Sequence, residues 1–344
     1  MTTLAGAYDV ALLDLDGVVY IGEHAVAGAA QGLAAAREQG MSLTFVTNNA
    51  SRPPEVVAEH LRDLGVPAQA HEVVTSSQAG AAILIERFPP GSEVLAVGGP
   101  GVDEAIHAVG LVPVRAGSVV RTPAAVLQGF GRDVAWVDLA AATVAIAAGA
   151  YWVATNTDVT LPVPGGRAPG NGALVSAVAA ALGRGPDEVA GKPFPALMRA
   201  SIDRTDARRP LVVGDRLDTD IAGARTVGVP SLLVMTGVTD VAGLLRADPA
   251  ERPDFIGADL LALSAEPAAT QGDSESAPRR DDRGWARGDA RTELHDGRLI
   301  VTPGEGPWIE ALQCACAAAW SAAGAVDVAA AADAIEARRR TVGP

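Results

Sequence analysis

Short apolar segments alternate with helical segments along this chain, and this alternation restricts the fold more than any other feature. Val10–Leu13 is an uninterrupted apolar run, and residues 25–40 follow it with the composition of a helix. The same order recurs from 42–49 and again from 209–216, each time with a helical segment after it. Continuous apolar strands that alternate with helices are typical of a parallel sheet covered on both faces. We therefore predict an α/β protein with a Rossmann-like, doubly wound parallel sheet as its core.

Polar side chains stand where these predicted strands end. Asp14 and Asp16 follow the first strand directly. Thr47 and Asn48 end the second strand, and Asp215 follows the apolar run of the third. In sheets of this kind the ligand lies beyond the carboxyl ends of the strands. We therefore expect these five residues to gather in one crevice.

The residue types at these strand ends predict phosphoryl transfer. Neighbouring carboxylates repel each other unless a cation or a proton offsets their charge. The hard oxygen donors of Asp14 and Asp215 suit Mg²⁺, which takes a few carboxylates together with water and substrate phosphate. One carboxylate of the DxD pair could attack phosphorus while the other acts as the general acid. The hydroxyl and backbone amides at Thr47 and Asn48 could hold the phosphoryl oxygens, and Lys192 could neutralise their charge.

Four short motifs carry a resemblance to a known family. They occur in the order found in the haloacid dehalogenase superfamily: DLDG at 14–17, FVTNN at 45–49, GKP at 191–193 and GDRLDTD at 214–220. The long insertion between the second and third motifs resembles the α/β-capped branch, which includes p-nitrophenyl, phosphoglycolate and glycerol 3-phosphate phosphatases. ATNTD, PGNGAL and LDTDIAGA are further matches to that branch. The resemblance covers roughly residues 8–262, and it is specific because several spaced motifs agree.

The resemblance implies a role for each motif residue. It implies Asp14 as the nucleophile that forms an aspartyl-phosphate and Asp16 as the general acid and base. It implies Thr47 as a phosphate ligand with Lys192 as its electrostatic partner. The implied Mg²⁺ ligands are Asp14, the main-chain carbonyl of Asp16, and Asp215, with Asp220 in support.

The implied activity is that of a Mg²⁺-dependent phosphatase of small phosphomonoesters, with glycerol 3-phosphate as the first choice of substrate. Phosphoglycolate and sugar phosphates are the alternatives, as is a catalytically degenerate phosphate-binding or regulatory protein. Aromatic residues make up only 4% of the chain, so few rings could stack on a nucleobase. The Gly- and Pro-rich segment 155–174 is the predicted specificity loop. Its candidate substrate contacts are Asn156, Asp158, Arg167 and Asn171.

The pattern of segments predicts several domains. Alternating strands and helices between the second and third motifs indicate an inserted α/β cap, and a small, charged, Pro- and Gly-containing stretch indicates a linker. The predicted parts are a catalytic core (1–77 and 189–262), the cap (78–188), a linker or mobile loop (263–283) and a C-terminal α+β extension (284–344). We expect the extension to dock on the core through its Ala-rich helices with Trp308 and Trp320, rather than to form a separate, acyltransferase-like ligand-binding domain.

Composition limits the partners and the compartment. The formal net charge of −14 disfavours nucleic acid, so a small phosphorylated metabolite is the expected partner. No apolar segment reaches the roughly 20 residues needed to span a bilayer. Only Cys314 and Cys316 are present, and no signal peptide is visible, which favours a cytoplasmic protein. A homo-oligomer formed through the cap is a further expectation.

Overall fold

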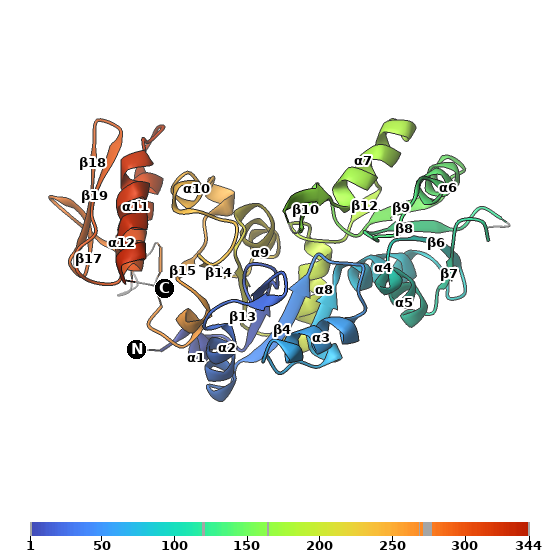
Figure 1. The fold of residues 1–344 in the computed structure, drawn as a ribbon, viewed down its shortest axis with the longest axis horizontal. Coiled ribbons are helices and arrows are strands. Elements are labelled where there is room, and N and C mark those ends of the chain that lie inside the picture. The colour runs from blue at the N-terminus through green and yellow to red at the C-terminus, as the bar shows by residue number, and fades with distance from the viewer. Residues whose placement is uncertain (1, 119–120, 164, 268, 271–276, 343–344) are drawn as a thin grey trace. The chain divides into compact units, whose positions relative to one another are not determined.

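The structure is a computed structural model that describes residues 2–118, 121–163, 165–267, 269–270 and 277–342 (Figure 1). Its contacts divide it into two compact units. Unit 1 consists of the residues up to Leu43 and from Ala207 onward, and unit 2 is Thr44–Asp206.

The core of unit 1 contains the parallel strands that the sequence predicts. β1 pairs with β13, β13 with β14 and β14 with β15, all in parallel. All four residues of β1 are buried, as are those of β14, because both faces of the sheet are covered. The strands are β1 (Val10–Leu13), β13 (Pro210–Gly214), β14 (Ser231–Val234) and β15 (Phe255–Gly257).

Short helices and turns connect these strands. Asp240 caps the helix after β14, since its side chain accepts a hydrogen bond from the Gly243 amide at 2.6 Å. A π-helical turn, Leu217–Ile221, follows β13. The helices are α1 (Leu4–Ala7), α2 (Ala29–Glu38), α9 (Ala222–Val227) and α10 (Val241–Leu245); 3₁₀ turns are Pro249–Glu251 and Leu260–Leu263, and a small hairpin joins β2 (Tyr20–Ile21) to β3 (His24–Ala25).

The C-terminal extension is also part of unit 1, and it contains more strands than expected. The run WARGDARTEL at 285–294 has the composition of a single strand, but Gly288, with φ +54°, turns the chain and divides that segment into β17 and β18. The last residues of the predicted linker form β16, while residues 268 and 271–276 of that linker lie outside the described residues. The elements are β16 (Arg279–Asp281), β17 (Gly284–Arg287), β18 (Ala290–His295), β19 (Arg298–Thr302), α11 (Trp308–Ser321) and α12 (Ala329–Val342).

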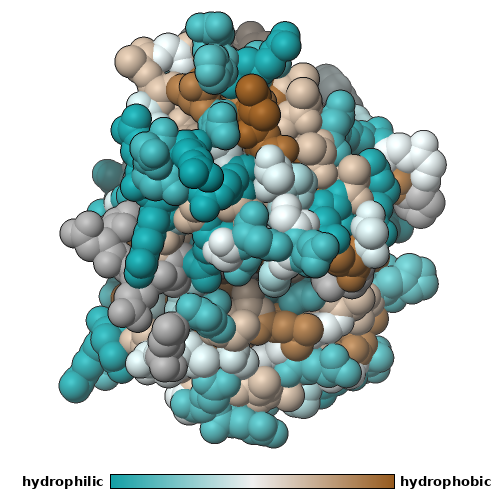
Figure 2. All heavy atoms as spheres, turned by 90° about the vertical axis from the view of Figure 1, so that its left-hand side faces the viewer, coloured by the Kyte–Doolittle hydropathy of each residue, from teal (hydrophilic) through white to brown (hydrophobic). Residues whose placement is uncertain are grey.

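The extension docks on the core of unit 1, as expected from its sequence. The four strands form one antiparallel sheet, and α11 packs on it (Figure 1). Trp308 and Trp320 are buried in one apolar cluster that also contains Leu233 of β14 and Leu244 of α10. The Trp320 indole donates a hydrogen bond to the Leu244 carbonyl at 3.3 Å. On the face shown in Figure 2, which is the left-hand side of Figure 1, hydrophobic residues form small areas among larger hydrophilic ones.

Unit 2 holds a second set of parallel strands. β4 (Ser42–Thr47), which belongs to unit 2 from Thr44 onward, pairs with β5 (Val73–Thr75), and a five-stranded parallel sheet has the order β12-β9-β8-β6-β7. The strands of that sheet all lie within 93–189, inside or at the edge of the predicted cap, whose limits stay a prediction. They are β6 (Glu93–Val97), β7 (Val112–Val114), β8 (Ala125–Gln128), β9 (Tyr151–Ala154) and β12 (Glu188–Val189).

Helices cover both faces of the five-stranded sheet. α4 and α5 pack together on one face, and α6 and α7 on the other (Figure 1). A hairpin formed by β10 and β11 precedes α7. The remaining elements of unit 2 are α3 (Pro54–Asp63), a 3₁₀ turn (Ala70–Glu72), α4 (Ser76–Arg87), α5 (Pro100–Ala108), α6 (Trp136–Ala147), β10 (Thr160–Val163), β11 (Gly166–Pro169), α7 (Asn171–Leu182) and α8 (Pro195–Thr205).

Candidate active site

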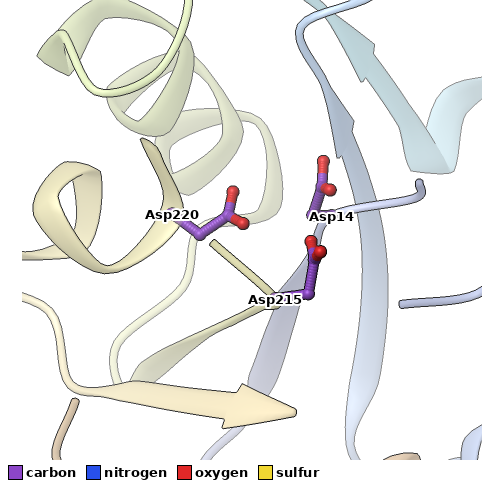
Figure 3. Close-up of side chains that lie close together, drawn as sticks. All are labelled: Asp14, Asp215 and Asp220. Atoms are coloured by element: carbon purple, nitrogen blue, oxygen red, sulfur yellow. The ribbon is translucent and has the colours of Figure 1, made fainter. Parts of the chain in front are cut away.

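Three aspartates of unit 1 come together where its strands end. Each of Asp14, Asp215 and Asp220 offers a carboxylate oxygen, and these atoms all lie within 4.8 Å of one another. Figure 3 shows the three carboxylates gathered from the end of β1, the end of β13 and the π-helical turn. Asp215 and Asp220 are fully buried, and Asp14 is half-buried. Sequence reasoning placed Asp220 only in support, whereas the structure puts it in the cluster itself.

Strand pairing sets the positions of Asp14 and Asp215. β1 and β13 are neighbours, and the Asp14 amide extends their ladder by donating to the Val213 carbonyl at 2.8 Å. The Asp215 carboxylate then accepts a hydrogen bond from the Val238 amide at 2.6 Å. A Cβ atom at Gly17 or Gly237 would collide with this carboxylate. Only glycine at both positions therefore leaves room for Asp215.

The π-helical turn sets the position of Asp220. The Asp220 carboxylate accepts the Arg216 amide at 3.1 Å, and a Cβ at Gly214 would collide with it. Within the same turn the Arg216 guanidinium pairs with Asp218 at 2.7 Å, and this partner lowers the pKa of Asp218. Asp218 therefore faces a cation of its own and is not one of the clustered carboxylates. The sequence gives no sign of the π turn, because one additional residue in a helical turn leaves no periodic pattern.

Asp16 stands apart from the cluster. It is exposed, whereas its neighbour Leu15 is fully buried, so the DLDG turn directs alternate side chains to opposite environments. Gly17, with φ +85°, closes the turn, and its amide donates to the Tyr20 carbonyl at 2.8 Å.

The aspartate cluster fits a small divalent cation. Three carboxylates this close, two of them buried, repel one another strongly in a site shielded from water. Carboxylate oxygens are the hard donors that Mg²⁺ prefers. Among the described residues this is the only cluster of three or more potential metal-ligating side chains.

In unit 2, Lys192 and Thr47 are buried close to the end of β4. Both side chains are about 3% exposed. The Lys192 ammonium donates a hydrogen bond to the Val46 carbonyl at 3.2 Å, and the Thr47 hydroxyl accepts one from the Asn49 amide at 3.0 Å. Unit 2 therefore holds a buried cation and a hydroxyl near one strand end.

The Asn48 side chain connects three parts of unit 2. Its oxygen accepts the Lys192 amide at 2.8 Å, and its nitrogen donates to the Lys192 carbonyl and to the Asp158 carboxylate, both at 3.1 Å. Its main-chain carbonyl accepts bonds from Ser76 and Asn156. The sequence led us to expect a phosphate ligand through the backbone, and it gave no indication of this connecting role, since Asn156, Asp158 and Lys192 are all more than 100 residues away.

The four predicted specificity residues divide into two groups. Asn156 and Asn171 are buried, and the Asn171 amide donates to the main-chain carbonyls of Asn156 and Gln128. These two asparagines therefore shape the loop. Asp158 is half-buried and held by Asn48, and Arg167 is exposed on β11.

Comparison with known proteins decides the family. The sequence profile of haloacid dehalogenase-like hydrolases matches residues 11–112, and that described as HAD-hydrolase-like matches 189–263. D-glycerol 3-phosphate phosphatase of Mycobacterium tuberculosis is 48% identical over 263 residues, which is 76% of this chain and 73% of that protein. The chain belongs to the haloacid dehalogenase-like hydrolases. Within this family, acid sugar phosphatase of Staphylococcus saprophyticus is 38% identical over 67% of this chain and 88% of its own.

A solved structure of this family matches nearly the whole chain. The glycerol phosphate phosphatase of Mycobacterium tuberculosis in complex with magnesium aligns with a TM-score of 0.85 and 39% identity, over 99% of each chain. The C-terminal extension, which the motif resemblance does not cover, therefore has a counterpart in that structure.

Two features of the extension argue against a separate binding site in this hydrolase. The amides of Glu305 and Gly306, in the loop before α11, both donate to the Asp289 carboxylate, which lowers the pKa of Asp289. That loop therefore already binds an anion of the same chain. Cys314 and Cys316 are buried, and burial raises the pKa of the Cys314 thiol to about 12.

Proposed function

We propose that this haloacid dehalogenase-like hydrolase is a Mg²⁺-dependent phosphatase that prefers glycerol 3-phosphate among small phosphomonoesters. The observation that carries the proposal is the cluster of Asp14, Asp215 and Asp220 in a chain 48% identical to a D-glycerol 3-phosphate phosphatase. Hydrolysis proceeds through an aspartyl-phosphate intermediate. We assign the metal to Asp14, the Asp16 carbonyl and Asp215, with Asp220 in support.

The aspartates of the DLDG turn perform the two chemical steps. When bound, Mg²⁺ supplies positive charge that offsets the repulsion between carboxylates and phosphoryl oxygens. The Asp14 carboxylate attacks phosphorus, the bond from phosphorus to the ester oxygen breaks, and Asp16 donates its proton to the departing alcohol. Asp16 then takes a proton from water, the water oxygen attacks the phosphorus, and phosphate leaves Asp14 regenerated. The exposed position of Asp16 supports a role at the leaving group.

Residues of unit 2 serve the phosphoryl group in this proposal. Thr47 donates its hydroxyl to a phosphoryl oxygen, the backbone at Asn48 assists, and Lys192 neutralises charge that develops in the transition state. The Asn48 side chain supports this role, because it bonds to both the amide and the carbonyl of Lys192.

The cap segment selects the alcohol part of the substrate. We assign direct contacts to Asp158 and Arg167, and loop shaping to Asn156 and Asn171, whose side-chain donors are used within unit 2. A carboxylate accepts hydrogen bonds from hydroxyl groups and repels a second carboxylate. Asp158 therefore favours glycerol 3-phosphate over phosphoglycolate.

A phosphate-release screen tests this function. The substrates are glycerol 3-phosphate, phosphoglycolate, glucose 6-phosphate, nucleoside monophosphates and pyridoxal phosphate, each with Mg²⁺ and with a chelator. We expect the highest kcat/KM for glycerol 3-phosphate and no turnover with the chelator. A higher value for a nucleotide or for pyridoxal phosphate would reject the substrate assignment, and no turnover of any ester with Mg²⁺ would reject the phosphatase.

The setting in which the enzyme works is part of the proposal. Within the part of the chain that the structure describes, the helices lack the length and hydrophobicity that a membrane span requires. We place the enzyme in the cytoplasm, which a fractionation experiment would test. We also propose a homo-oligomer through the cap, since Trp136, Val137 and Val144 of α6 are exposed apolar residues. Light scattering that finds only monomers at micromolar concentration would reject the oligomer.

A further inference from the structure

The last helix of the chain reaches back to a strand end beside the aspartate cluster. Arg339 of α12 donates a hydrogen bond from its guanidinium to the Met235 carbonyl at 2.7 Å. The guanidinium carbon lies 5.0 Å from the centre of the Trp308 ring, and the Glu336 carboxylate is 3.5 Å from the other terminal nitrogen. Arg339 is about two-thirds buried. It is thus held by an aromatic face and an anion, and it binds the main chain of the catalytic core.

Met235 opens the segment that contacts the metal-binding turn. The next residue, Thr236, donates its hydroxyl to the Gly17 carbonyl at 2.6 Å. Two residues later, the Val238 amide donates to the Asp215 carboxylate at 2.6 Å, and the Thr239 amide donates to the Asp215 carbonyl at 3.2 Å. Residues 236–239 therefore fix both the DLDG turn and the orientation of Asp215.

The extension also holds the other end of this segment. α10 begins directly after it and packs against α11 and α12. Trp320 of α11 is buried against α10, and its indole donates to the Leu244 carbonyl. The extension thus contacts the chain on both sides of the five residues between Met235 and α10. Before them, Arg339 donates a hydrogen bond to Met235, and after them, Trp320 packs against α10.

We propose that Arg339 is a positioning residue that couples the C-terminal extension to the metal-binding carboxylate of Asp215. The inference rests on the proposed function, because it concerns Mg²⁺ binding at the aspartate cluster. With Arg339 in place, Met235 is fixed, and the Val238 amide meets the Asp215 carboxylate. Without Arg339, residues 236–239 become more mobile, and the Val238 amide is hydrogen-bonded to the Asp215 carboxylate for less of the time.

The geometry of this site favours arginine over lysine. A planar guanidinium can stack on the Trp308 ring while it donates from its edge to Met235 and Glu336. A lysine ammonium could keep the charge and one donor but not the stacked plane. Partners one step from a metal ligand typically change metal affinity by about 10- to 100-fold. Arg339 acts one step further out, so we expect a loss of about 3- to 10-fold.

The experiment compares Arg339→Gln with Arg340→Gln. Both changes remove one positive charge from α12, but Arg340 is exposed. Mg²⁺ binding is measured by calorimetry without substrate, together with KM for glycerol 3-phosphate and thermal unfolding. We expect R339Q to bind Mg²⁺ about 3- to 10-fold more weakly, R340Q to match the wild type, and Arg339→Lys to lie between. The KM at saturating Mg²⁺ should be unchanged.

The outcomes separate this inference from the proposed function. A folded R339Q protein that binds Mg²⁺ as tightly as the wild type overturns the role of Arg339, even if its thermal stability is lower. Should R339Q not fold, Arg339→Lys against Arg340→Lys gives the same decision, with weaker Mg²⁺ binding expected only in the former. A wild-type protein that binds no Mg²⁺ and releases no phosphate rejects the proposed function instead.

Discussion

Gly237 offers the sharpest test of how unit 1 builds the proposed metal site. A Cβ atom at this position would collide with the carboxylate and the Cβ of Asp215, so Gly237→Ala must displace the aspartate or the segment around it. Displacement breaks the 2.6 Å hydrogen bond from the Val238 amide to the Asp215 carboxylate. A hydrogen bond to a charged group is worth about 1.5–3 kcal/mol. Loss of orientation at a metal ligand typically lowers affinity by about 10- to 100-fold.

The assay measures phosphate release from glycerol 3-phosphate against Mg²⁺ concentration, with urea unfolding in parallel. We expect Gly237→Ala to raise the half-saturating Mg²⁺ concentration by about 10- to 100-fold. The free energy of unfolding should fall by about 1–3 kcal/mol, as is usual for overpacking. Gly324→Ala is the matched control, because a Cβ there meets no atom within 4 Å. If Gly237→Ala and Gly324→Ala gave the same Mg²⁺ dependence, the described packing around Asp215 would be wrong.

Three further predictions follow from the site and the extension. Asp16→Ala should slow esters with poor leaving groups, such as glycerol 3-phosphate, far more than aryl phosphates, and equal losses in kcat would argue against its role as the acid. Asn48→Asp should lower the free energy of unfolding, because it removes both hydrogen bonds donated by the amide and places a carboxylate against that of Asp158. Adding Asp158→Asn in the same chain should restore part of the lost stability. If urea unfolding showed that the stability losses of the two single variants simply add in the double variant, the contact would be refuted. Asp289→Ala should destabilise the protein at neutral pH. Backbone donors lower the pKa of Asp289 in the folded state. The wild type should therefore be more stable than Asp289→Ala above the unfolded-state pKa, and this difference in the free energy of unfolding should vanish as pH falls through the folded-state pKa. A difference in stability that persisted in acid would contradict this.

The sequence was most informative where chemistry and strand order coincide. Asp14 and Asp215 follow apolar runs, so their approach at the ends of neighbouring parallel strands could be predicted before any coordinates. The α/β class and the docking of the extension through its tryptophans were also confirmed.

Contacts made by the main chain could not be read from side-chain types. The Val238 amide orients Asp215, and Gly17 and Gly237 leave room for it. Neither role can be recognised from the residue type alone, because every residue except proline has a backbone amide and glycine occurs throughout the chain. The partners of the Asn48 side chain are brought to it only by the fold of unit 2. The strand boundary at Gly288 was missed because one glycine in an otherwise strand-like run can equally mark a bulge.

The catalytic role of Asp14 is the central claim, and one measurement tests it most directly. Initial rates of phosphate release from glycerol 3-phosphate are compared for the wild type and Asp14→Asn, each with saturating Mg²⁺ and with a chelator, after urea unfolding has shown that both proteins fold. We predict turnover only in the wild type with Mg²⁺, because an amide cannot replace the carboxylate that attacks phosphorus. Phosphate release by folded Asp14→Asn at a rate near that of the wild type would contradict the aspartyl-phosphate mechanism.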